Sequence, residues 1–165
     1  MAIVSLDKAV LSPSYCQCCF RPMRKGMSLL NLMILVVDDN PDICWALDHL
    51  LGKLGAQCVR ASDGQSALQA MQLHRLALML VDAKLPDMDG LDLAGRVRGA
   101  DPAVPVIMVS GYFYEDDPDI QAALAQGLIC GFVEKPFAHA AITGAMEAAL
   151  CSREAALAVE AAVVC

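Results

Sequence analysis

Short apolar runs alternate with amphipathic stretches along most of this chain, beginning after residue 31. Buried parallel strands read as unbroken apolar runs, whereas surface helices bury one stripe with a period near 3.6 residues. The apolar runs expected to be strands are Met33–Val37, Leu76–Val81, Pro105–Val109 and Cys130–Val133, and a short strand is also expected over about Gln57–Arg60. The stretches expected to be helices run from Asn40–Pro41 to Gly55, from Asp63 to about His74, from about Leu91 to Arg98, from Asp117–Pro118 to Gly127, and onwards from near Phe137.

The starts of two expected helices carry clear signals. Asn40–Pro41 and Asp117–Pro118 each combine an N-cap residue with a proline in the first turn. The first helix also has a regular apolar stripe, formed by Ile43, Leu47, Leu50, Leu51 and Leu54. Strands that alternate with helices in this way indicate an α/β fold, a doubly wound five-stranded parallel sheet with helices on both faces.

Charged residues follow three of the expected strands. Asp38 and Asp39 follow the first, Asp82 ends the third, and Lys135 lies just beyond the fifth. Because sites in open α/β sheets lie beyond the carboxyl ends of the strands, these side chains are expected to meet at one edge. Crowded carboxylates need a compensating cation, and an oxygen site that keeps several waters suits Mg²⁺.

These residue types favour phosphoryl chemistry. Lys135 supplies a point charge of the kind that holds phosphate, and Ser110, at the end of the fourth strand, supplies a hydroxyl donor. An aspartate such as Asp82 can attack a phosphoryl group and form an acyl phosphate. The metal, the ammonium and the hydroxyl would then stabilise the charge of the transition state.

Four segments together resemble the receiver domain of two-component response regulators, in the right order and spacing from about Met33 to about Leu150. They are Val36–Asn40, Val81–Gly90, Pro105–Gly111 and Val133–Phe137. The resemblance implies a flavodoxin-like sheet with the strand order 2-1-3-4-5.

The resemblance also implies roles for the acidic residues. Asp82 would be the phosphoacceptor, charged by the phosphohistidine of a histidine kinase or phosphotransfer protein. Asp39, Asp82 and the backbone carbonyl of Lys84 would hold Mg²⁺, and Asp38 would assist through water.

Further roles implied by the resemblance fall at the ends of the last two strands. Ser110 and Lys135 would bind the new phosphoryl group, and Ser110 and Phe132 would form the conformational switch. The peptide bond between Lys135 and Pro136 would be cis.

Structural roles compete with some of these assignments. Asp38–Asp39 also suits an acid pair at a helix N-terminus, favoured by the helix dipole. Ser110 also suits a simple turn, and Phe132 is an interior strand residue in its own right. Asp87 and Asp89 flank a glycine turn and are expected to be turn and cap residues rather than ligands.

Composition narrows the classes of function. The chain of 165 residues is 57% apolar, which excludes a disordered protein, and its net charge of −7 argues against a nucleic-acid partner. No stretch reaches the length of a membrane span, so a cytoplasmic protein is expected. A zinc role for the cluster Cys16, Cys18 and Cys19 is not expected, because no second pair follows at ligand spacing.

Three segments are expected: an extension over 1–31, a receiver domain over 32–150 and a helical tail over 151–165. The extension is interpreted either as a disordered arm or as the product of an upstream start site. For the tail, fraying is favoured over a homodimer formed through this helix.

The expected function is that of a stand-alone phosphoacceptor switch that signals through a downstream effector protein. It would catalyse its own Mg²⁺-dependent phosphorylation and dephosphorylation rather than turn over external substrates. The alternatives are a receiver-fold binding module in which phosphorylation is dispensable and a flavodoxin-like nucleotide or redox protein. The second alternative lacks a phosphate-cradling loop after the first strand.

Overall fold

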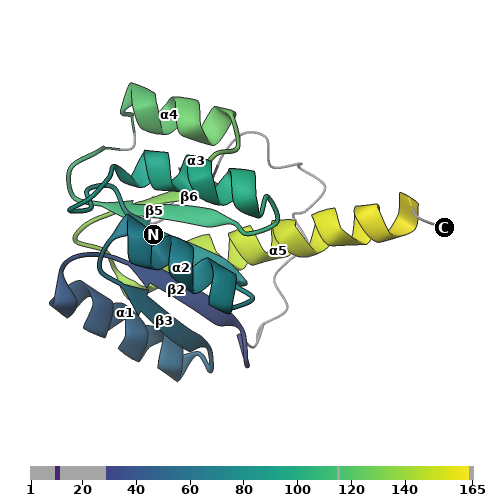
Figure 1. Ribbon diagram of the computed structural model, residues 1–165, viewed down its shortest axis with the longest axis horizontal. Coiled ribbons are helices and arrows are strands. Elements are labelled where there is room, and N and C mark those ends of the chain that lie inside the picture. The colour runs from purple at the N-terminus through teal and green to yellow at the C-terminus, as the bar shows by residue number, and fades with distance from the viewer. Residues whose placement is uncertain (1–9, 12–28, 115, 164–165) are drawn as a thin grey trace, which may run out of the picture.

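The computed structural model describes residues 10–11, 29–114 and 116–163 (Figure 1). Its strands are β1 (Val10–Leu11), β2 (Met33–Val37), β3 (Gln57–Ala61), β4 (Leu78–Asp82), β5 (Val106–Ser110) and β6 (Gly131–Glu134). Its helices are α1 (Pro41–Lys53), α2 (Gly64–Leu73), α3 (Gly90–Ala100), α4 (Pro118–Ala125) and α5 (His139–Val163). Every expected strand and helix is present, with small shifts at the ends.

The sheet has the order β1-β6-β5-β4-β2-β3. Strands β2 to β6 are parallel and, numbered from β2, follow the predicted order 2-1-3-4-5. The predicted five parallel strands are confirmed, and β1 adds a further, antiparallel strand at the edge, in which Val10 pairs with Phe132. A strand of two residues leaves no periodic pattern in the sequence, so it was missed. Most of the predicted extension over 1–31 lies outside the described residues.

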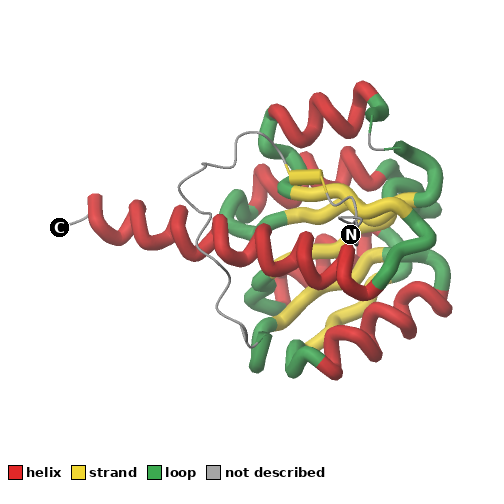
Figure 2. Tube along the Cα trace, turned by 180° about the vertical axis from the view of Figure 1, so that it is seen from behind, coloured by secondary structure: helices red, strands yellow, loops and turns green. Residues whose placement is uncertain are grey.

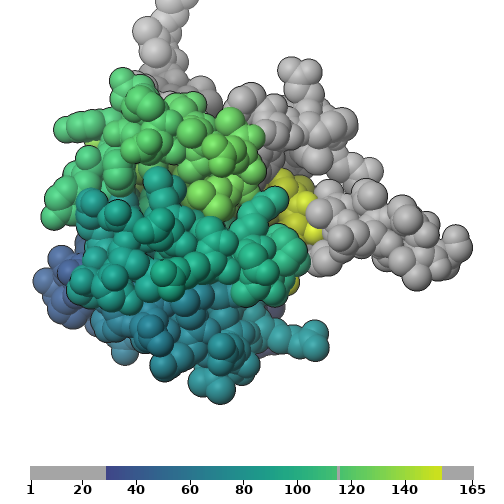
Figure 3. Space-filling view, turned by 45° about the horizontal axis from the view of Figure 1, so that its top comes forward, coloured from purple at the N-terminus to yellow at the C-terminus, as the bar shows by residue number. Residues whose placement is uncertain are grey.

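Helices cover both faces of the sheet, as predicted. Helices α1 and α5 bury their apolar side chains on one face, together with Ile34, Leu78 and Ile107. Helices α2, α3 and α4 pack on the other face (Figures 1 and 2), where their side chains form a continuous outer surface (Figure 3). Leu29, the first residue of the described segment 29–114, has a side chain buried with α1. No helix in the described part of the chain has the length and apolar character needed to cross a bilayer.

N-cap residues determine where helices α1 and α4 begin after the preceding strands. The Asn40 side chain accepts a hydrogen bond from the Asp42 N–H at 2.9 Å, and Asp117 caps α4 in the same way through the Asp119 N–H. Such caps satisfy donors that have no partner inside the helix. Helix α1 therefore begins three residues after Asp38, and the acidic residues stay in the connecting turn.

Helix α5 continues beyond the sheet (Figure 2), and Arg153 fastens this part to the core. One guanidinium nitrogen donates to the carbonyls of Leu76 and Ala77, at 3.1 and 2.8 Å. The link joins α5 to the segment that enters β4, at the end of the strands opposite the acidic residues. Sequence periodicity gives no signal for such a contact.

Replacing Arg153 with alanine is expected to lower the free energy of unfolding by about 1–2 kcal/mol, because two buried carbonyls lose a charged donor. Chemical denaturation followed by circular dichroism measures the change. Arg96→Ala is the matched control, since that side chain is exposed on α3. Equal losses in the two variants would contradict a specific role for Arg153.

Candidate functional site

Three carboxylates from two strands meet at the carboxyl edge of the sheet. Asp38 and Asp39 follow β2, Asp82 ends the adjacent strand β4, and one oxygen of each carboxylate lies within 4.8 Å of the others. Asp38 and Asp82 are buried, whereas Asp39 is exposed. The sequence-based prediction that these residues meet is therefore confirmed.

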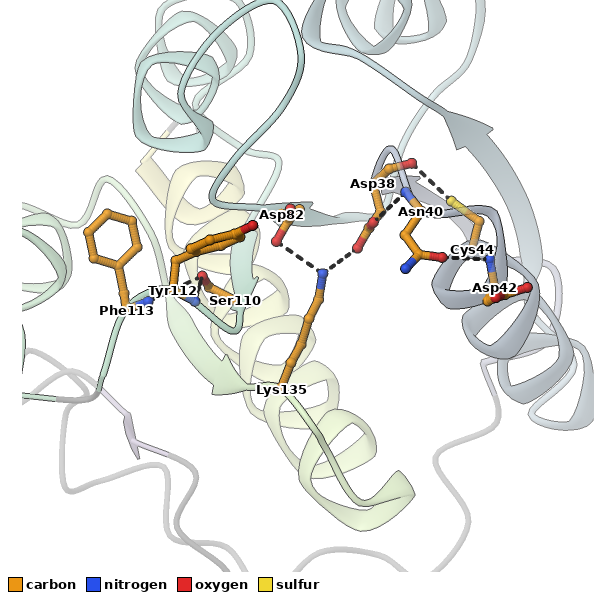
Figure 4. A network of polar contacts seen from close by, with 9 residues as sticks. All are labelled: Asp38, Asn40, Asp42, Cys44, Asp82, Ser110, Tyr112, Phe113 and Lys135. Carbon is orange, nitrogen blue, oxygen red and sulfur yellow. Dashed lines mark hydrogen bonds and ion pairs between the residues drawn. The ribbon is translucent and has the colours of Figure 1, made fainter.

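Lys135 reaches into this group from the loop after β6 (Figure 4). Its Nζ lies 2.5 Å from Asp38 Oδ2 and 3.0 Å from Asp82 Oδ1. Asp38 Oδ1 meanwhile accepts a hydrogen bond from the backbone N–H of Asn40, at 2.9 Å. Both oxygens of Asp38 are thus engaged in this structure, and the exposed carboxylate of Asp39 faces solvent.

The cluster is short of positive charge. Three carboxylates face one ammonium, so two negative charges remain if all these groups are ionised. Burial raises the pKa of Asp82 above its ordinary value, and the negative charge of Asp38 adds to this, while Lys135 opposes both. Burial disfavours the charged form of Lys135, but its hydrogen bonds to Asp38 and Asp82 outweigh burial and raise its pKa.

Ser110 lies at the end of β5 and is fully buried. Its Oγ accepts hydrogen bonds from the backbone N–H groups of Tyr112 and Phe113, at 3.0 and 3.4 Å. Ser110 therefore stabilises a turn, which was the alternative to phosphate binding that the sequence left open for this residue. Because the oxygen accepts both bonds, the hydroxyl hydrogen remains a donor for another group.

Two further predicted residues lie on or just after β6. Phe132 is buried and packs with the core beneath α3 and α4. The Lys135–Pro136 peptide bond is cis, as the resemblance implied.

The loop between β4 and α3 contains Lys84, whose ammonium pairs with Asp89 at 2.8 Å. This hydrogen bond raises the pKa of Lys84. Gly90, which begins α3, lies so close to the strand that a Cβ there would be 2.2 Å from the backbone oxygen of Asp82. Only glycine can lie this close to the strand, and the start of α3 therefore packs directly against the end of β4.

The sequence did not reveal the partner of one residue of this region. Asp87 was expected to be a turn or cap residue, and its carboxylate accepts hydrogen bonds from the N–H groups of Gly64 and Gln65, at 2.8 and 2.9 Å. These residues are the first two of α2. No local pattern reveals a partner more than twenty positions away.

Of the described cysteines, Cys44, Cys58 and Cys151 are free thiols. Cys44 is buried beside the site and donates to the backbone oxygen of Asp38 at 3.2 Å. Burial raises its pKa above the ordinary value, and Asp38 adds to the effect, so the thiol is a packing group rather than a nucleophile. The cluster Cys16, Cys18 and Cys19 lies outside the described residues.

Comparison with known proteins places these features in a family. Residues 34–147 match the response regulator receiver domain. The chain is 41% identical to the sensor histidine kinase RcsC of Escherichia coli K12 over 80 residues, 48% of this chain but only 8% of that protein. It is 34% identical to sporulation initiation phosphotransferase F of Bacillus subtilis over 109 residues, 66% of this chain and 86% of the relative.

A solved structure agrees with the sequence matches. The response regulator protein TrrA of Thermotoga maritima, in complex with Mg²⁺–BeF, superposes with a TM-score of 0.62 at 25% identity. The alignment covers 70% of this chain and 96% of TrrA.

Proposed function

This chain belongs to the family of response regulator receiver domains, and from that premise we propose that it is a phosphoacceptor switch of a two-component phosphorelay. Asp82 is the proposed acceptor. The observation that carries the proposal is the contact of Lys135 with Asp38 and Asp82 at the edge where three carboxylates meet.

In the proposed reaction an oxygen of Asp82 attacks the phosphorus of a phosphohistidine. The new P–O bond forms as the P–N bond breaks, and the imidazole leaves with the bonding electron pair and takes up a proton. Lys135 lies 3.0 Å from Asp82, and we propose that its ammonium pairs with the phosphoryl oxygens as their charge develops. Ser110 is proposed to donate its hydroxyl hydrogen to one of those oxygens.

The donor set suits Mg²⁺. With its carboxylates ionised the cluster carries two excess negative charges, and it offers only oxygen ligands, which is the chemistry that Mg²⁺ prefers. Asp39 and Asp82, with the backbone carbonyl of Lys84, are proposed to hold the ion. Asp38 is proposed to act through water, since both its oxygens already accept hydrogen bonds. When bound, the ion would neutralise phosphoryl charge during transfer.

Ser110 and Phe132 are proposed to carry the change of state away from the site. If the Ser110 hydroxyl turns to the phosphoryl group, the backbone of Tyr112 and Phe113 loses its acceptor and the loop before α4 can shift. Phe132 packs beneath α4, so its buried position would be coupled to that movement. Phosphorylation would then shift a two-state face formed by α4, β6 and α5.

The proposed partners are a histidine kinase or phosphotransfer protein, which supplies the phosphoryl group, and an effector protein that reads the switched face. The chain matches only a small part of RcsC, itself a sensor histidine kinase. The similarity to RcsC therefore does not identify the kinase or the effector of this protein.

Incubation with acetyl phosphate tests the proposed function. In the presence of Mg²⁺, intact-mass spectrometry is expected to show the addition of one phosphoryl group, and a chelator should prevent it. If neither acetyl phosphate nor a panel of phosphorylated histidine kinases labels the protein, a binding module without phosphorylation becomes the better account.

Replacing Asp39 with asparagine is expected to weaken Mg²⁺ binding by about tenfold or more, because an anionic ligand becomes neutral. Isothermal titration calorimetry measures the affinity. Asp42→Asn is the matched control, since this exposed residue lies three positions away on α1 and outside the acidic cluster. The assignment of Asp39 fails if both variants bind Mg²⁺ like the wild type.

A further inference from the structure

The loop between β4 and α3, residues 83–89, is held by bonds within itself. The Gly90 N–H donates to the Ala83 oxygen at 2.8 Å, and the Leu85 N–H donates to the Met88 oxygen at 3.3 Å. The Lys84–Asp89 ion pair closes the same loop from the solvent side. These contacts shape the loop, while the close approach of Gly90 to Asp82 fixes its ends, and Leu85 and Met88 pack against the core.

Asp87 adds a hydrogen-bonded link from this loop to helix α2. Its two oxygens accept hydrogen bonds from successive N–H groups of α2, those of Gly64 and Gln65. The next N–H group, that of Ser66, donates to Asp63 at 2.7 Å. Two carboxylates thus satisfy the first three donors of α2, where the helix dipole also favours negative charge.

Because Gly64 has no side chain, the side chain of Met88 can approach the helix backbone closely. A Cβ at this position would lie 2.4 Å from Met88 Sδ, so any other residue would displace Met88. Helix α2 packs in turn against β2 and β3, and β2 is the strand that leads into Asp38 and Asp39. The start of α2 is therefore held by the sheet, and the loop contacts it through the hydrogen bonds of Asp87 and the side chain of Met88.

We propose that Asp87 is a positioning residue of the cation site: it fastens the loop to the start of α2 and so helps to hold in place the carbonyl of Lys84, two residues after Asp82 in the chain. The inference rests on the proposed function, because that function makes this carbonyl a ligand. Asp87 is outside the acidic cluster and acts through the backbone. A loop held in place before the ion arrives loses less entropy on binding.

The test compares Asp87→Ala and Asp87→Asn with the wild type. Asp101→Ala is the matched control, because Asp101 also accepts a backbone hydrogen bond, from the Ala103 N–H at 3.0 Å, but in the loop beyond the far end of α3. Each variant is checked by circular dichroism and assayed at a temperature where it is fully folded. Mg²⁺ affinity is measured by calorimetry, and amide hydrogen exchange of Gly64 and Gln65 is measured without metal.

Asp87→Ala is expected to weaken Mg²⁺ binding about tenfold and to speed exchange at Gly64 and Gln65. Asp87→Asn, which keeps an oxygen acceptor, should fall between the wild type and alanine in both measurements. Asp101→Ala should keep the wild-type affinity.

Wild-type Mg²⁺ affinity in Asp87→Asn and Asp87→Ala, together with faster exchange, would overturn the proposal and reduce Asp87 to a cap of α2. The same holds if Asp101→Ala weakens binding as much as Asp87→Ala. Failure of the proposed function looks different, since the wild type itself would then bind no Mg²⁺ and accept no phosphoryl group.

Discussion

Replacing Lys135 with methionine is expected to destabilise the metal-free protein by about 3–5 kcal/mol at neutral pH. Lys135 is the cation that pairs with Asp38 and Asp82, and both carboxylates are buried. Without the ammonium, their charges face each other away from water. The same variant should accept almost no phosphoryl group, because the cation that stabilises the transferring oxygens is gone.

Urea denaturation in the presence of a chelator measures this loss of stability. Lys84→Met is the matched control: it removes an ammonium of the same kind, but one in an exposed pair with Asp89. Exposed pairs contribute about 0–1 kcal/mol, so the control should stay near the wild type. A Lys135→Met protein as stable as Lys84→Met would show that the buried carboxylates do not depend on this cation.

Replacing Asp82 with asparagine is expected to abolish phosphorylation while raising the stability of the metal-free protein. Burial raises the pKa of Asp82, so the folded protein keeps the proton at pH values where the unfolded chain has lost it. The ionised carboxylate therefore costs stability at neutral pH, and this cost disappears as the pH falls through the raised pKa. Asparagine removes the charge and keeps the shape.

Denaturation of Asp82→Asn and wild type at several pH values gives the sign of this effect. The stability advantage of Asp82→Asn should be present at neutral pH and shrink in acid. Asp92→Asn, at an exposed position in the first turn of α3, is the control and should be phosphorylated like the wild type. A less stable Asp82→Asn, or one that is labelled normally, contradicts the account.

The strands and helices could be predicted because their signals come from residues that are close together in the sequence. Strands β2, β4 and β5 are apolar almost throughout, and the caps at Asn40 and Asp117 mark helix starts with residues adjacent in sequence. The meeting of Asp38, Asp39, Asp82 and Lys135 followed from topology, since parallel strands deliver their carboxyl ends to one edge.

What could not be predicted depends on distant partners. Arg153 contacts carbonyls about seventy-six positions away, and Asp87 reaches the start of α2. The two-residue strand β1 is too short to carry a pattern. Ser110 accepts hydrogen bonds from the N–H groups of Tyr112 and Phe113, and the sequence predicted this turn only as an alternative to phosphate binding.

The location of the phosphoryl group tests the central claim most directly. Wild-type protein is incubated with Mg²⁺ and acetyl phosphate, and the product is reduced with borohydride, which converts an aspartyl phosphate to homoserine. Tandem mass spectrometry then reads the modified position. The account predicts homoserine at position 82 and nowhere else, whereas an unmodified Asp82 in a phosphorylated protein, or homoserine at another position, would contradict it.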